Sequence, residues 1–280
     1  MTDLIQALLN PNIPFLRNAL LVGILSSASF GVIGTFIVVR KISYIAGAIS
    51  HSVLGGIGLA LYCQYAFGWE WFHPMAGAFL AALVSALIIG SAKFYAKERE
   101  DTIIGAIWAV GMASGLLFIA KTPTYIEPMS YLFGNILIVT SADLLYILLL
   151  DIIVVALGIF CFNKLQASSF DEDFTAVRGI NPEFYYFLLL ILTALTVVLM
   201  TTIVGIVMVI ALLTLPAAIS NLFFKRLIPV IFMTTIVTLL LNTSGIAVSY
   251  ITDLPSGPVI IVMAGILYLF SFIIQAIRKN

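Results

Sequence analysis

Charged residues are scarce in this chain. Of its 280 residues, 9% are Asp, Glu, Lys or Arg, whereas 62% are hydrophobic and the mean hydropathy is +1.17. A soluble domain carries about 25% charged residues, so this composition leaves too few charges to cover a surface exposed to water. Lys+Arg and Asp+Glu are 13 each, and this zero net charge argues against a nucleic-acid partner. Most of the chain is therefore predicted to lie in a membrane, surrounded by lipid.

Residue types and motifs on which many enzymes depend are missing as well. Only two cysteines and two histidines occur, which excludes a disulfide framework and a multi-histidine metal cage. No glycine is followed directly by lysine, so the P-loop that cradles ATP phosphates is absent. The sequence also contains neither a G-x-S-x-G elbow nor H-E-x-x-H. We therefore predict that the chain is not an enzyme and holds no permanently bound cofactor.

Long apolar runs dominate what is present. A bilayer core about 30 Å thick requires roughly 20 apolar residues in a helix. Hydropathy predicts nine such spans, with eight or ten as alternatives, because only Thr201 and Thr202 separate the sixth span from the seventh. The spans are 15–39, 44–66, 74–95, 102–120, 142–163, 183–201, 203–224, 227–251 and 256–277. The predicted fold class is all-α, a polytopic transmembrane helical bundle.

Two further segments complete this organisation. The stretch 128–139 is too short to cross a membrane and is interpreted as re-entrant or as a half-helix. No predicted loop exceeds about 20 residues, which leaves no room for a folded soluble module. Residues 1–280 are therefore predicted to form one transmembrane domain, with a cytoplasmic segment at 164–182.

The basic residues predict the orientation of the bundle. If the loop after the first span is cytoplasmic, eleven basic residues lie inside and only Arg17 and Lys121 lie outside. Such a bias is typical of a multi-pass protein with its positive loops in the cytoplasm. The N-terminus is then outside and the C-terminus inside. The inside set is Arg40, Lys41, Lys93, Lys97, Arg99, Lys164, Arg178, Lys225, Arg226, Arg278 and Lys279.

Titratable side chains at membrane depth are costly, so each is a candidate site. His51 lies in the second span among small residues, and a neutral imidazole is a common ligand for divalent transition metals. A buried histidine that only hydrogen bonds between helices is the alternative. Asp151 lies near the middle of the fifth span. Its carboxylate could bind an ion, although a structural hydrogen bond to a neighbouring helix is the favoured interpretation.

The loop 164–182 carries an acidic cluster on the otherwise basic face. Ser169 followed by Glu172 matches a capping box, and Gly179 suits the end of a helix of about nine residues. Asp171, Glu172 and Asp173 would then occupy its first turn, where the helix dipole favours anions. Anionic lipids would repel such a cluster, so a protein partner or simple solvation explains it better.

Several segments together resemble one family. They are PFLRNALLVGILSSASFGVIGTFIVVRKISYIAGAISHSVLGG at 14–56, LFGNILIVTSADL at 132–144, Phe170 to Gly179, and VGIVMVIALLTLPAAIS at 204–220. In this order and spacing they resemble the permease subunits of bacterial ATP-binding-cassette importers for zinc, manganese and related metal ions. The resemblance implies a bacterial inner-membrane location and a pore shared with a second permease copy or a homologous permease.

The resemblance also implies partners and residue roles. Separate P-loop ATPase subunits would dock on the cytoplasmic face, and an extracytoplasmic metal-binding protein would deliver the ion. His51 matches a histidine of the family's ion pathway. The family often has an aspartate four residues earlier, where this chain has Gly47, which leaves the identity of the metal open. The segment implied to contact the ATPase includes Phe170, Asp171, Glu172, Asp173, Ala176 and Gly179.

The resulting hypothesis is a metal-ion importer permease that transports zinc or manganese with ATP consumed by its partners. The first alternative is a secondary transporter that works without ATP. It predicts several paired intramembrane charges, of which only His51 and Asp151 are deeply placed. The second alternative is a structural membrane subunit of another complex.

Overall fold

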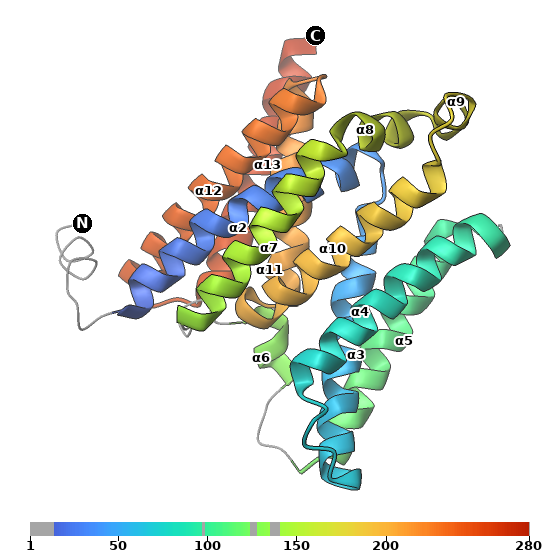
Figure 1. Cartoon of the computed structure of the whole chain (residues 1–280). Helices are drawn as coiled ribbons and strands as arrows, with labels where there is room; N and C mark the ends of the chain where they lie inside the picture. Colours follow the sequence, from blue (N-terminus) through green and yellow to red (C-terminus); the bar gives the residue numbers. More distant parts are fainter. Residues whose placement is uncertain (1–13, 97–98, 124–127, 135–140, 280) are drawn as a thin grey trace.

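The computed structural model describes residues 14–96, 99–123, 128–134 and 141–279 (Figure 1). Every regular element within these ranges is a helix, and nine of the helices are long and apolar enough to span a membrane. They are α2 (Pro14–Val39), α3 (Tyr44–Phe67), α4 (Pro74–Ser91), α5 (Glu100–Lys121), α7 (Ser141–Phe160), α10 (Pro182–Val204), α11 (Ile206–Phe223), α12 (Leu227–Thr252) and α13 (Ser256–Lys279). The predicted all-α bundle is thereby confirmed.

Four shorter helices accompany the spans. A five-residue π-helix, η1 (Ala92–Ala96), extends α4. The helix α6 (Pro128–Phe133) is the described part of the stretch expected to be re-entrant or a half-helix, and residues 135–140 lie outside the described ranges. The helices α8 (Phe162–Phe170) and α9 (Glu172–Val177) occupy the predicted cytoplasmic segment. Figure 1 shows α8 and α9 at the same end of the bundle as the C-terminus, with α6 toward the opposite end.

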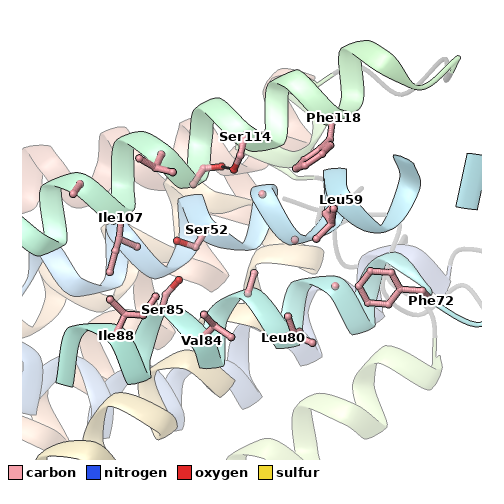
Figure 2. Close-up of a pocket in the computed structure, with 17 residues that line it drawn as sticks. Ser52, Leu59, Phe72, Leu80, Val84, Ser85, Ile88, Ile107, Ser114 and Phe118 are labelled. Atoms are coloured by element: carbon pink, nitrogen blue, oxygen red, sulfur yellow. Dashed lines mark hydrogen bonds between the residues drawn. The ribbon is translucent and has the colours of Figure 1, made fainter. Parts of the chain in front are cut away.

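Helix α3 is the most buried span because α4 and α5 pack along its two sides (Figure 2). Small residues bring the backbones together. A methyl group added at Gly111 would lie 2.8 Å from the Cα of Ser52, and one added at Gly58 would lie 2.6 Å from the carbonyl oxygen of Gly115. Close approach of this kind is how small residues stabilise helix pairs in lipid. The Gly111 and Gly115 spacing therefore packs α5 against α3.

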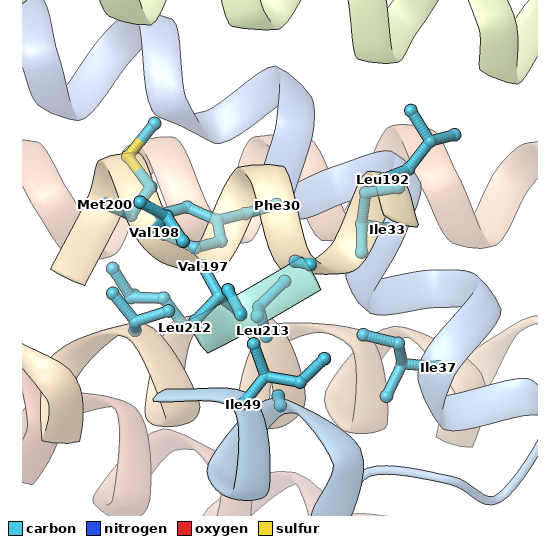
Figure 3. Close-up of a cluster of buried hydrophobic side chains, with 14 of the residues drawn as sticks. Phe30, Ile33, Ile37, Ile49, Leu192, Val197, Val198, Met200, Leu212 and Leu213 are labelled. Atoms are coloured by element: carbon cyan, nitrogen blue, oxygen red, sulfur yellow. The ribbon is translucent and has the colours of Figure 1, made fainter. Parts of the chain in front are cut away.

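Close packing at small residues also joins α2 to α12. The side-chain amide of Asn242 donates a hydrogen bond of 2.9 Å to the backbone carbonyl of Gly23, and a methyl group at Gly23 would contact Asn242 Cβ. About two helical turns further along α2, Gly31 faces Thr235. Buried side chains of α2, α3, α10 and α11 then close the core, including Phe30, Ile49, Leu192 and Leu213 (Figure 3).

The boundary between α10 and α11 differs from the prediction. The break falls at Gly205, not at Thr201 and Thr202. Gly205 has φ of 88° and ψ of 158°, a conformation that side-chain-bearing residues rarely adopt. Its backbone packs directly against that of Gly134, which has φ of 58° at the end of α6. The two threonines continue the helix because contact with α6 sets the break.

Candidate functional site

His51 lies about one third of the way along α3 with a buried side chain. Its imidazole stacks on the indole of Trp108 from α5, with ring centroids 4.7 Å apart and planes inclined by 27°. The Nδ1 atom is buried and has no hydrogen-bond partner, and the hydroxyl oxygen of Ser50 beside it also has none. Buried polar atoms are normally satisfied, and Nδ1 of His51 is one of six buried side-chain atoms in the described ranges that have no partner within the chain.

Gly47 lies one turn before His51, on the same face of α3. A methyl group added there would overlap the six-membered ring of Trp108. The indole therefore occupies the volume that a side chain at this position would need. In this arrangement position 47 has no room for a carboxylate side chain next to His51.

Asp151 is also buried, but it faces a different part of the bundle. The hydroxyl of Ser29 on α2 donates a hydrogen bond to its Oδ1, and its Oδ2 has no partner. His51 instead stacks on α5. Within the described ranges, no group of three or more His, Cys, Asp or Glu side chains could hold a metal ion. Asp151 is thus placed as an interhelical hydrogen-bonding residue, in line with the favoured interpretation.

A cavity of ≈ 390 Å³ opens between α3, α4 and α5 (Figure 2). Its lining is apolar except for three hydroxyls, those of Ser52, Ser85 and Ser114. Ser52 and Ser114 already donate to carbonyl oxygens of their own helices. This cavity therefore offers no strong ion ligand.

The segment after α7 forms two helices where the sequence predicted one. Ser169 belongs to the last turn of α8 and donates to the carbonyl of Leu165, so it does not cap the next helix. The N-cap is Asp171, whose carboxylate accepts a hydrogen bond of 2.9 Å from the backbone N–H of Phe174. The predicted capping box is therefore wrong, because aspartate caps a helix as well as serine does.

The end of α9 follows the prediction. Gly179 has φ of 75° and donates its N–H to Ala176, while Ile180 donates to Thr175. These two bonds make a Schellman motif, which needs a left-handed residue after the helix. Pro182 then starts α10 at its first turn, as expected.

Glu172 anchors α9 to the bundle. Its carboxylate pairs with the guanidinium of Arg40, at the end of α2, and lies 2.7 Å from the Nζ of Lys93 in η1. Lys93 also lies 3.0 Å from Glu100, and both cations lie over the ring of Tyr186, at 4.5 Å and 4.2 Å. Burial lowers the pKa of Arg40, and the carboxylate of Glu172 opposes that shift. This cluster links five elements: α2, η1, α5, α9 and α10.

Three large apolar side chains are exposed at the end of α8 and on α9. Phe170, Phe174 and Val177 are 64%, 49% and 88% exposed, respectively. Among the residues predicted to contact an ATPase, Glu172 turns inward, whereas Phe170, Asp173, Ala176 and Gly179 lie on the surface. Phe174 and Val177 were missed by the sequence analysis. The sequence shows only that both residues are apolar, and their exposure, which is typical of an interaction site, is seen only in the structure.

The part of the chain that the structure describes, with nine helices suited to span a membrane and an exposed α9 at one end, defines a polytopic membrane protein of the permease type. Residues 12–275 match the model of the ABC 3 transport family, and the chain belongs to that family.

Relatives and solved structures agree with this assignment. The chain is 39% identical to a probable metal transport system membrane protein of Chlamydia muridarum, covering 94% of this chain and 89% of the relative. It is 33% identical to the manganese transport system membrane protein MntC of Listeria monocytogenes, covering 92% and 90%. Its fold is similar to that of PsaBC from Streptococcus pneumoniae, with a TM-score of 0.83, 29% identity and coverage of 97% and 95%.

Proposed function

We propose that this chain is the membrane-spanning permease subunit of an ATP-driven metal-ion importer. The observation that carries the proposal is the family match over residues 12–275, which spans nearly the whole described bundle. Relatives named for metal and manganese transport support a divalent metal as cargo. Two copies, or this chain and a homologous permease, would enclose the ion path, and the cytoplasmic membrane would be the location.

The chain takes its energy from separate ATPase subunits on the face that carries α9. It has no P-loop of its own. The exposed side chains of Phe170, Phe174 and Val177 offer an apolar surface for such a partner, and Glu172 ties that surface to Arg40 and Lys93. A displacement of α9 is therefore transmitted to the end of α2 and to η1 through these ion pairs.

The orientation follows from the same face. Positive-inside bias places α8, α9 and the C-terminus in the cytoplasm and the N-terminus outside. An extracytoplasmic metal-binding protein would then deliver its ion to the opposite face.

His51 is the residue proposed to contact the ion in transit. The unpaired Nδ1 is a ligand atom for zinc or manganese, and a single imidazole binds weakly enough to release the ion again. Trp108 covers the ring in this arrangement, so its side chain must move for an ion to reach Nδ1. Asp151 remains outside this proposal because its carboxylate already accepts from Ser29.

The test is uptake of radioactive manganese and zinc by cells that express the chain with candidate ATPase and binding proteins. His51→Ala should lower uptake at least tenfold, whereas His73→Ala should leave it unchanged, because His73 is exposed at the start of α4. Unchanged uptake in His51→Ala removes this residue from the mechanism. Uptake by the chain without nucleotide, or failure of any ATPase to co-purify with it, contradicts the importer proposal itself.

A further inference from the structure

A long groove runs along the outer face formed by α2, α7 and α12. Its first section has a volume of ≈ 460 Å³, and its lining is almost entirely apolar, including Ala28, Val155, Gly158 and Phe232. The ridges beside it are apolar and exposed as well, with Phe232 67% exposed. Figure 1 shows α2, α7 and α12 side by side along this face, and α2 packs against both neighbours.

A second section continues the groove toward the end that carries α8. It has a volume of ≈ 560 Å³, and its lining includes Gln166, Lys225 and Arg226. Phe162 and Ile228 line both sections, so the two sections are adjacent. The sections meet where the chain bends between α7 and α8.

The charged side chains that line the second section are all positive. Lys225 and Arg226 are exposed, and neither forms an ion pair with any residue in the described ranges. No Asp or Glu lines either section of the groove. Two unpaired cations thus stand at the membrane-surface end of an apolar channel, beside the amide of Gln166.

We infer that this groove binds one phospholipid with an anionic headgroup. An acyl chain fills the apolar section, and the phosphate lies against Lys225 and Arg226. Basic pockets next to transmembrane helices on the cytoplasmic side recognise anionic headgroups by charge, and apolar surface at membrane depth recognises the tail. A soluble protein partner would match only the basic end, since the rest of the groove lies between helices long and apolar enough to span a membrane.

The experiment is native mass spectrometry of the full chain, titrated with phosphatidylglycerol or phosphatidylcholine of the same acyl composition. The wild type should retain phosphatidylglycerol preferentially. Lys225→Gln combined with Arg226→Gln should reduce that retention about 25-fold, because each cation near an anionic headgroup contributes about fivefold. Retention of phosphatidylcholine should change little.

Matched variants test the basic and the apolar section separately and control for a general effect of losing charge. Arg99→Gln with Arg278→Gln removes the same charge from exposed positions outside the groove and should leave retention unchanged. The swap of Lys225 to Arg and Arg226 to Lys should keep it. Ala28→Phe narrows the apolar section and should lower retention of both lipids.

Three results would overturn the inference. They are equal retention of the two lipids by the wild type, an unchanged preference in the double Gln variant, and full retention in Ala28→Phe. Loss of ATPase co-purification in the double Gln variant, with phosphatidylglycerol retention intact, would assign the basic end to that partner instead.

Discussion

Glu172→Gln is the most direct test of how α9 is held on the bundle. The change keeps the size of the side chain but removes the charge that pairs with Arg40 and Lys93. Breaking a fully buried pair costs about 3–5 kcal/mol, whereas an exposed pair contributes about 0–1 kcal/mol. The Arg40 side chain is 6% exposed and that of Glu172 is 33% exposed, so the expected cost lies between these limits, at about 2–3 kcal/mol.

Hydrogen exchange measures this cost locally. The backbone N–H groups of Thr175, Arg178 and Ile180 are bonded within α9 and its cap, so they exchange when the segment opens. A loss of about 2–3 kcal/mol speeds their exchange by roughly 30-fold to 150-fold.

Asp173→Asn is the control for the loss of charge. Asp173 lies next to Glu172 in the same helix turn but is exposed, so its variant should change exchange by less than about fivefold. Equal exchange in the two variants would refute the assignment of Glu172 as the anchor of α9. The same comparison in an ATPase assay with bound partners should show weaker coupling for Glu172→Gln alone.

Three further variants test packing inside the bundle, each by its thermal unfolding midpoint in one detergent. Gly47→Asp should destabilise the chain by about 1–3 kcal/mol because its side chain overlaps the indole of Trp108. Adding Trp108→Ala to the same chain should relieve part of that cost. If the destabilisation of the double variant equalled the sum of the two single variants, the overlap would be contradicted. Ser29→Ala should cost about 1–3 kcal/mol by leaving a buried carboxylate oxygen on α7 without its donor, and a neutral result would argue against that bond. Gly205→Ala should destabilise the chain by about 1–3 kcal/mol from the positive φ of residue 205 alone. Gly105→Ala is the control, because Gly105 has open space around it and alanine favours a helix, so this variant should not destabilise the chain. Equal unfolding midpoints for the two variants would refute the contrast.

Most of the fold was predictable because a transmembrane helix is a local property of the chain. Lipid offers no partner for backbone polar groups, so each apolar run of sufficient length must satisfy them within one helix. The predicted spans accordingly begin and end within about four residues of the observed ones. Gly179 and Pro182 also marked their helix boundaries correctly, because the φ preferences of glycine and proline act on a single residue.

The site was predictable only as single residues. His51 stood out because an imidazole at membrane depth is rare, but its stacking on Trp108 depends on how closely α3 and α5 pack. The inward turn of Glu172 depends on Arg40 and Lys93, which are more than 70 residues away along the chain. No local pattern encodes such pairs.

The amino-acid order alone thus determined the number of spans, the concentration of positive charge at one end and the lack of an ATP-binding loop. Hydropathy and charge are properties of each residue and do not depend on how the chain folds. The packed bundle decided which neighbours those residues meet: the indole over His51, the two cations on Glu172 and the backbone contact that ends α10 at Gly205. These contacts join distant segments, and close packing of the whole molecule selects them.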